Sequence, residues 1–197
     1  MTEMAPCERT FCRSVPWRAF TRRLVVPLVV RGRRFEGCWL EVGAGAGVMA
    51  ESLLERNPKM TVVATDLDPV MCSEALRTLS GLSGRAFVAA ADATRLPFPD
   101  ATFDGVASFL MLHHVIEWEE MFPEIARVLR PGGLLFGYDL VRSPVMRLLH
   151  RLERSPHRIA STEEIRETLA RLPFEDVKVA PRSLGMFVQF RARRRSE

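Results

Sequence analysis

Short apolar runs alternate with longer stretches of helical periodicity through the middle of the chain. Five runs of five to seven residues are rich in β-branched, aromatic or aliphatic side chains and end at Gly, Asp or a turn, which is typical of buried β-strands. These runs are Cys38–Val42, Met60–Ala64, Phe87–Ala91, Phe103–Phe109 and Leu134–Tyr138.

The stretches between these runs are expected to form helices. Asn57-Pro58 ends the first, Pro69 suits the first turn of the second, and Met121–Leu129 forms a third that stops before Pro131. Strands alternating with helices predict an α/β fold, a doubly wound, mostly parallel sheet with helices on both faces. Ligands of such sheets bind beyond the carboxyl ends of the strands, where the polar and glycine residues of this sequence fall.

The pattern changes after the fifth strand. Ser143–Arg158 is predicted to form an amphipathic helix, and Ser161 with Glu164 has the form of a capping box that starts another helix, ending near Leu172. No helical segment separates the last two apolar runs, so we expect them to pair as antiparallel strands and to bring the sheet to seven strands. They are Phe174–Val179 and Gly185–Ala192.

Composition and charge narrow the function classes. Of the 197 residues, 47% are apolar and 26% are charged, the balance of one globular domain that needs no disulfide or metal for stability. The net charge of +4 is unevenly placed: residues 1–37 carry +5, residues 191–197 carry +3, and the body between them carries −4. Nucleic-acid binding requires a basic surface on the folded body, so the acidic body weighs against it.

The sequence also argues against membrane, secreted and metal-binding classes. The longest uncharged run, Gly105–Ile116, has 12 residues, whereas a membrane-spanning helix needs about 20. No apolar signal segment with a cleavage site is present at the start, and the four Cys residues form no CxxC pair. We therefore expect a cytoplasmic protein with reduced thiols, no integral membrane segment and no metal.

The clearest chemical signal is a glycine-rich turn between the first strand and its helix. In Glu41-x-Gly43-x-Gly45-x-Gly47, glycines allow a tight turn and let a ligand approach the backbone N–H groups at the helix start. Asp66 ends the next strand, 19 residues after Gly47, where a carboxylate can accept two hydrogen bonds from a ribose diol. The alternatives are a purely structural turn and a helix cap at Asp66. The spacing differs from the GxGxxG of dinucleotide sites, so a ligand with a ribose but no pyrophosphate, such as S-adenosylmethionine, fits better.

Six motifs occur in an order that resembles the class I S-adenosylmethionine-dependent methyltransferases, especially the small-molecule and lipid branch with a type 11 domain. The resemblance covers residues 36–139 strongly and 160–192 loosely. The motifs are Leu40-Glu41-Val42-Gly43-Ala44-Gly45-Ala46-Gly47, Thr65-Asp66-Leu67-Asp68-Pro69, Asp92-Ala93-Thr94-Arg95-Leu96-Pro97-Phe98, Phe103-Asp104, Leu112-His113-His114-Val115 and Arg127-Val128-Leu129-Arg130-Pro131-Gly132-Gly133.

The resemblance implies a role for each cofactor-site residue. The glycine turn, with Ala44, would hold the methionine part, and Glu41 would lie beneath it. Asp66 would bind the ribose diol, Leu67 would pack on the adenine, and the end of the fourth strand would flank the methionine chain or the methyl group. The implied cofactor-binding residues are Glu41, Gly43, Ala44, Gly45, Gly47, Asp66, Leu67, Asp92, Ala93, Ser108 and Phe109, with Asp92 and Ala93 on the adenine edge and Asp68 capping the next helix.

Methyl transfer from a sulfonium requires mainly alignment, and a base is needed only if the acceptor must lose a proton. His113 and His114 are the candidate bases because histidine titrates near neutral pH. The alternative is that one of them caps the following helix and the other packs under it. Ser108-Phe109-Leu110-Met111 stands where amino-group methylases of nucleobases or glutamine carry an Asn/Asp-Pro-Pro-aromatic motif, so those substrates are disfavoured.

The domain prediction is a basic appendage at 1–36, a cofactor-binding domain at 37–192 with a lid-like insert at 140–160, and a basic tail at 193–197. Arg147, Arg151, Arg154 and Arg158 would share one face of the insert helix. That face is either a solvated surface or, with Arg22–Arg34, part of a lid for an anionic or lipidic acceptor that docks on an anionic surface.

The hypothesis from the sequence is therefore a methyltransferase acting on a small-molecule or lipid acceptor. Two alternatives stay open. One is an RNA- or ribosome-associated methyltransferase guided by the basic ends, and the other is a non-catalytic protein that keeps the cofactor fold.

Overall fold

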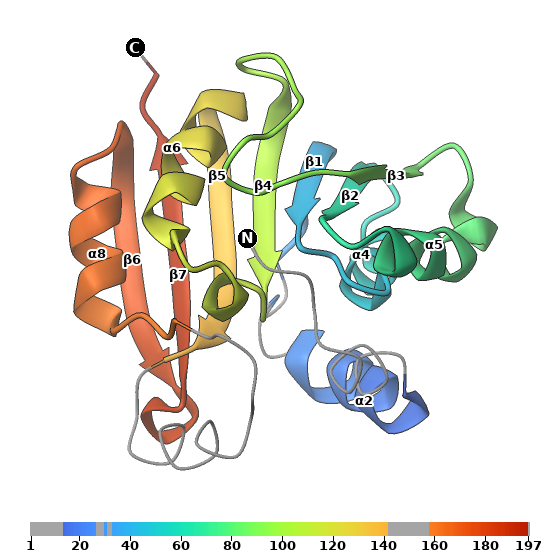
Figure 1. The fold of residues 1–197 in the computed structure, drawn as a ribbon. Helices are drawn as coiled ribbons and strands as arrows, with labels where there is room; N and C mark the ends of the chain where they lie inside the picture. Colours follow the sequence, from blue (N-terminus) through green and yellow to red (C-terminus); the bar gives the residue numbers. More distant parts are fainter. Residues whose placement is uncertain (1–13, 27–29, 31–32, 142–157, 197) are drawn as a thin grey trace.

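The computed structural model describes residues 14–26, 30, 33–141 and 158–196, and their strands form one seven-stranded sheet (Figure 1). The strand order is β3-β2-β1-β4-β5-β7-β6, in which β1 to β5 are parallel and β7 is antiparallel to both of its neighbours. The predicted doubly wound sheet with an antiparallel last strand is confirmed. The strands are β1 Gly37–Val42, β2 Met60–Asp66, β3 Ala86–Ala90, β4 Phe103–Phe109, β5 Leu129–Leu140, β6 Phe174–Arg182 and β7 Phe187–Arg194.

Helices cover both faces of the sheet, as predicted. The apolar sides of α4 and α5 join one buried cluster with β1 and β2, whereas those of α6 and α8 join another with β4, β5 and β7. Figure 1 shows α6 and α8 in front of the half of the sheet that contains β5, β7 and β6. The helices are α2 Val15–Phe20, α4 Val48–Arg56, α5 Pro69–Thr78, α6 Trp118–Val128 and α8 Thr162–Ala170, with short turns at η1 Thr21–Val25, η2 Ser80–Leu82, η3 Leu112–His114 and η4 Ser183–Gly185.

Helix caps predicted from the sequence are present. The side chain of Asp68 accepts a hydrogen bond from the backbone N–H of Val70 and so caps α5. Ser161 and Glu164 form the reciprocal capping box at the start of α8. Each cap satisfies N–H groups that have no partner inside the helix, which fixes where the helix begins.

The fifth strand begins earlier than predicted. Sequence analysis ended a helix at Leu129 and treated Pro131-Gly132-Gly133 as a break, but β5 already pairs with β4 at Leu129. Gly132 has a φ of 76°, and the register shifts between Phe103 and Gly105. A glycine in the left-handed region absorbs the irregularity, so the strand continues through it.

The segment before β1 contains a helix that sequence analysis did not predict. α2 continues into η1, where Arg22 forms an ion pair with Glu51 of α4. Val25 and Val26 are buried in the same cluster as α4. Contacts with α4 stabilise this helix, since its own sequence has no amphipathic period.

The predicted insert helix lies outside the described residues except for Arg158, for which the prediction is wrong. Arg158 is not helical: its N–H bonds to the carbonyl of His113, and its guanidinium pairs with Glu119. The guanidinium also lies over the ring of Trp118, 5.4 Å from the centroid. These contacts attach Arg158 to α6. Arg158 is therefore not part of the predicted basic face of the insert helix. Strand β7 extends to Arg194, two residues into the predicted basic tail.

No helix in the described ranges is long and apolar enough to cross a lipid bilayer.

Gly137 in β5 makes room for an aromatic ring of the core. A Cβ at this position would lie 1.9 Å from the ring of Phe190, which packs edge-on against Phe122. We expect Gly137→Ala to lower the free energy of unfolding by about 3 kcal/mol, because a well-packed core cannot move the ring without strain. Gly81→Ala is the matched control, since its Cβ would meet no atom within 4 Å. Urea denaturation of both variants measures the difference, and equal stabilities would contradict the packing argument.

Candidate functional site

The turn between β1 and α4 has the backbone shape that its three glycines allow. Gly43, Gly45 and Gly47 have φ values of 68°, 54° and 77°, a region that other residues rarely adopt. A Cβ on Gly43 would lie 1.9 Å from Cγ of Met111, in the segment after β4. Ala44 donates its N–H to the carbonyl of Thr65, at 2.8 Å. The turn is thus locked between the ends of β2 and β4.

Asp66 connects the glycine turn to the end of β2. Its Oδ2 accepts the N–H of Gly45 at 2.8 Å, and its Oδ1 accepts the N–H of Asp68 at 2.9 Å. Burial raises the pKa of this carboxyl, and the backbone N–H groups counteract the increase. A carboxylate has about four lone-pair positions, so two remain for ligand hydroxyls. Asp66 therefore has a structural role that sequence analysis did not foresee, besides its predicted ligand role.

Glu41 comes two residues before the glycine turn, near the end of β1. Its side chain is buried, and Oε2 has no hydrogen-bond partner among the described residues. Burial and the nearby Asp66 raise the pKa of Glu41 to about 8, although a hydrogen bond from the backbone of Ala50 opposes the shift. At neutral pH this carboxyl is therefore largely protonated in the ligand-free protein.

The end of β3 carries the predicted adenine-edge residues. Oδ1 of Asp92 accepts both the N–H and the hydroxyl of Thr94, each at 2.8 Å, and Ala93 is buried. One carboxylate oxygen of Asp92 thus stabilises the turn that this residue begins. The backbone N–H of the predicted residue Ala93 lies in this same turn.

Arg127 holds the loop that follows Asp92, a role that sequence analysis missed although it quoted the residue within a motif. Its guanidinium donates to the carbonyl oxygens of Leu96 and Phe98 and pairs with Glu124. A planar fork of donors can bridge several acceptors at once, which suits Arg for this position.

Ser108 and Phe109 lie where predicted, at the end of β4. Ser108 is fully buried, and its Oγ has no hydrogen-bond partner in the described chain. The ring of Phe109 packs edge-on against Phe136. The next residue, Leu110, has a φ of 52°, which turns the chain sharply away from the strand.

Asp139 organises the segment after β4, and sequence analysis missed it. It lies near the carboxyl end of β5, is fully buried, and accepts the N–H groups of Met111, Leu112 and Leu140 at 2.7 Å each. Its Oδ1 also lies 2.5 Å from Nδ1 of His113. The signal that could have found it is an acidic residue at the end of the fifth predicted strand, in the row where ligands bind.

The structure distinguishes the two candidate histidines. His113 is buried and bonded to Asp139, whereas His114 is more exposed and packs against His113 with its ring tilted by 40° and the ring centroids 4.1 Å apart. The alternative that one histidine caps the next helix is wrong, because Glu117 occupies the N-cap of α6 and no side chain caps it. An imidazole held at one nitrogen by a carboxylate has a fixed orientation at the other.

The predicted residues therefore gather at the carboxyl ends of neighbouring strands. Hydrogen bonds join the glycine turn to Asp66, and Met111 brings the turn against the segment that holds His113. Leu67 is partly buried beside Asp66. That one ligand spans the Asp92 turn and the glycine turn stays a prediction. The two Cys residues within the described ranges, Cys38 and Cys72, are free thiols, as predicted.

Comparisons with known proteins agree with this arrangement. A family model described as "Methyltransferase domain" matches residues 40–137, about half of the chain. A malonyl-(acyl-carrier protein) O-methyltransferase from Geobacter sulfurreducens is 34% identical over 151 residues, which cover 71% of this chain and 56% of that protein. A demethylmenaquinone methyltransferase from Clavibacter sepedonicus is 36% identical, over 66% of this chain and 49% of that protein.

Solved structures share the fold over nearly the whole length. A SAM dependent methyltransferase from Aquifex aeolicus superposes with a TM-score of 0.78 and 19% identity, covering 98% of this chain and 100% of that chain. At this identity the likeness concerns the fold alone. The chain spans about half the length of the curated relatives that it matches.

The buried carboxyl of Glu41 makes stability depend on pH. Its pKa in the folded protein, about 8, exceeds the ordinary value of 4.5, so the folded state holds the proton more tightly. The contribution of Glu41 to the free energy of unfolding should therefore be largest below about pH 4.5. It should fall by up to about 5 kcal/mol as the pH rises to about 8. Glu41→Gln keeps the shape and cannot ionise, so its stability should vary less over this range. Urea denaturation at several pH values checks this, and parallel curves for both proteins would contradict it.

Proposed function

Because the chain belongs to the class I S-adenosylmethionine-dependent methyltransferases, we propose that it transfers a methyl group from S-adenosylmethionine to a small-molecule or lipid acceptor. The observation that carries the proposal is the glycine turn bonded to Asp66, above the buried and unpaired Oε2 of Glu41. When bound, the cofactor supplies a methyl group already activated on a sulfonium.

The residues present fit this cofactor. Of the three glycines, Gly45 has the most room at its Cβ position, and two of the buried polar atoms that lack a hydrogen bond in the described chain, Glu41 Oε2 and Ser108 Oγ, lie near the ends of β1 and β4. A buried polar atom without a hydrogen bond costs about 1–3 kcal/mol, which a polar ligand group can recover. Glu41 and the turn would hold the methionine part, the remaining lone pairs of Asp66 the ribose, Leu67 and the Asp92–Ala93 turn the adenine, and Ser108 with Phe109 the region of the methyl group.

His113 is the residue that we propose as the proton acceptor when the acceptor group must lose a proton. Asp139 binds Nδ1 at 2.5 Å and is itself fixed by three backbone N–H groups, so Nε2 is the nitrogen that takes the proton. The buried carboxylate also stabilises the imidazolium that forms. Asp139 acts here as a positioning residue.

The acceptor class follows from the relatives and from charge. The relatives are named for a malonyl group on acyl-carrier protein and for demethylmenaquinone, a small acyl group and a lipid quinone. The acidic body of this chain disfavours a nucleic-acid acceptor. The cytoplasmic location, the domain division and contact with an anionic surface stay predictions.

Cofactor binding gives the first test. We expect calorimetry to detect S-adenosylmethionine binding, and Asp66→Asn to weaken it about 10- to 100-fold, since an amide oxygen replaces a carboxylate toward the ribose hydroxyls. Glu163→Gln on α8 removes an exposed carboxylate that pairs with Arg166 and serves as the control. Absence of binding to the unmodified protein would remove the proposed function.

The two histidines make a matched pair for the proton-transfer step. With short-chain demethylmenaquinone and a malonyl thioester as acceptors, His113→Gln should lower kcat by about 10²- to 10⁴-fold. His114→Gln should stay within about threefold, because His114 is more exposed than His113 and Asp139 fixes the ring of His113. Cofactor affinity measured by calorimetry should be unchanged in both. Full activity of His113→Gln would exclude this residue as the base.

A further inference from the structure

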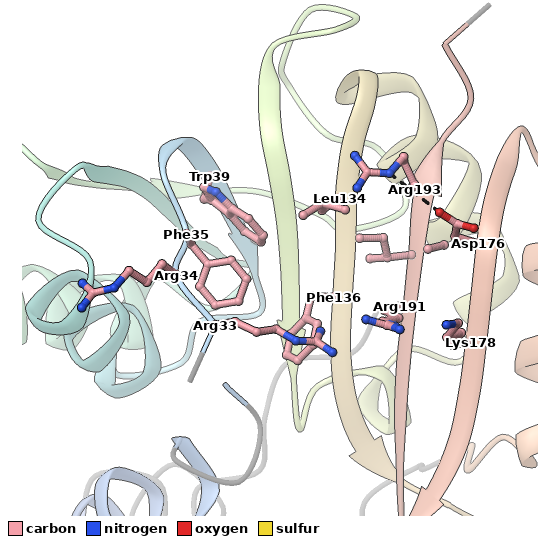
Figure 2. Close-up of a pocket in the computed structure, with 12 residues that line it drawn as sticks. Arg33, Arg34, Phe35, Trp39, Leu134, Phe136, Asp176, Lys178, Arg191 and Arg193 are labelled. Atoms are coloured by element: carbon pink, nitrogen blue, oxygen red, sulfur yellow. Dashed lines mark ion pairs between the residues drawn. The ribbon is translucent and has the colours of Figure 1, made fainter. Parts of the chain in front are cut away.

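A second concave site lies on the sheet face, over the amino-terminal half of β1 and the middle of β5. It is a cavity of about 380 Å³ between the segment before β1 and strands β5, β7 and β6 (Figure 2). Its floor is aromatic: Phe35 packs against Trp39 and Phe136, with centroid distances of 4.7 and 6.0 Å. Most of the proposed cofactor residues lie at the carboxyl ends of the strands. One of them, Phe109, packs against Phe136 on the floor of this cavity, so the two sites are neighbours with different lining residues.

Three cationic side chains cross this face in a row. Sheet register places Phe136 opposite Arg191, and Arg191 opposite Lys178. Arg33 reaches over from the segment before β1, and its guanidinium lies 5.4 Å from the centroid of Phe136. Figure 2 shows Arg33, Arg191 and Lys178 in line across β5, β7 and β6, whereas Arg34 extends away from the row.

No carboxylate within the described ranges forms an ion pair with these three cations. Elsewhere in the same part of the chain, exposed arginines pair with acids, as Arg130 does with Asp104 and Arg158 with Glu119. The one acid that lines the cavity, Asp176, lies 4.0 Å from the neighbouring Arg193.

A β-bulge sets the position of that acid. Glu175 pairs with Arg193 and Lys178 with Arg191, so Asp176 and Val177 both face Ala192, and Asp176 has a φ of 52°. Bulges of this kind re-aim side chains next to binding sites. Here the bulge keeps the carboxylate of Asp176 beside Arg193. Within the described residues, no carboxylate then pairs with the positive charges of Arg33, Arg191 and Lys178.

The positive charges of neighbouring side chains on this face repel one another. Directly opposed like charges on neighbouring strands destabilise a sheet, and Arg191 and Lys178 stand in that relation. Partial burial and the charge of Arg191 lower the pKa of Arg33. A bound anion would remove this repulsion, because guanidinium groups offer paired donors that match the geometry of phosphate oxygens.

We propose that this cavity binds the phosphate group of a small anionic ligand through Arg33, Arg191 and Lys178. The volume lies within the range of small-molecule sites, whereas a docked protein would need a contact of about 800 Å² on this side. The ligand is a phosphate ester or a diphosphate, with room for an apolar portion on the aromatic floor. The proposal goes beyond methyl transfer and does not depend on it.

Inorganic pyrophosphate is the probe for the test. Calorimetry should detect its binding to the full chain, and the double variant Arg191→Gln/Lys178→Gln should weaken binding at least 20-fold. The double variant Arg77→Gln/Arg171→Gln removes the same charge from α5 and α8, where both arginines pair with glutamates, and should stay within twofold. Addition of S-adenosylmethionine should leave pyrophosphate affinity within twofold, which separates this result from that of the cofactor site.

Thermal unfolding supplies a second measurement, which distinguishes loss of the phosphate site from a folding defect of the variant. Pyrophosphate should raise the melting temperature of the unmodified protein more than NaCl of equal ionic strength, and this excess should vanish in Arg191→Gln/Lys178→Gln. Without the ligand, that variant should melt no lower than the parent protein, since it loses only repulsion. Equal stabilisation of the two proteins, or binding that NaCl reproduces, would overturn the proposal. Binding only to phosphatidylglycerol vesicles, lost in the same variant, would also overturn it and assign the face to a membrane surface.

Discussion

The buried carboxylate of Asp139 is the interaction on which the candidate site depends. It accepts the N–H groups of Met111 and Leu112, and it fixes the ring of His113. A fully buried charge is costly unless hydrogen bonds replace its water, and four donors do so here. With its backbone anchored in this way, Met111 places its side chain where a Cβ on Gly43 would lie. Asp139, near the end of β5, thus positions the glycine turn after β1 through Met111.

The remaining strand ends are joined by similar contacts. Asp66 connects β2 to the glycine turn, and Arg127 closes the loop after β3 by bonding to its carbonyl oxygens. These contacts satisfy several polar groups inside the protein. Within the described residues, Glu41 Oε2 and Ser108 Oγ still have no hydrogen-bond partner. This combination of rigid turns and unsatisfied buried polar atoms is what a polar ligand stabilises on binding.

The sheet face over the middle of β5 has a different balance of charge. There the strands bring Arg33, Arg191 and Lys178 together over an aromatic floor without a balancing carboxylate. Sequence analysis had placed the basic residues in appended ends, and Arg33 and Arg191 do come from those ends. Their convergence on one cavity joins two segments that are about 160 residues apart in the chain, and only the antiparallel placement of β7 beside β5 accounts for it.

The sequence by itself determined the α/β fold, the strand positions to within a few residues, the caps at Asp68 and Ser161, and the grouping of polar residues at strand ends. These features depend on local periodicity, turn chemistry and the rule that parallel strands present their carboxyl ends at one edge. The helix before β1, the early start of β5 through Gly132, and the pairing of Asp139 with His113 were decided by tertiary structure. Each results from contact between residues far apart in the chain: α2 and η1 are stabilised by α4, Leu129 by β4, and the orientation of His113 by a carboxylate 26 residues away. A local pattern carries no record of such partners, because their distances are fixed only when the sheet assembles.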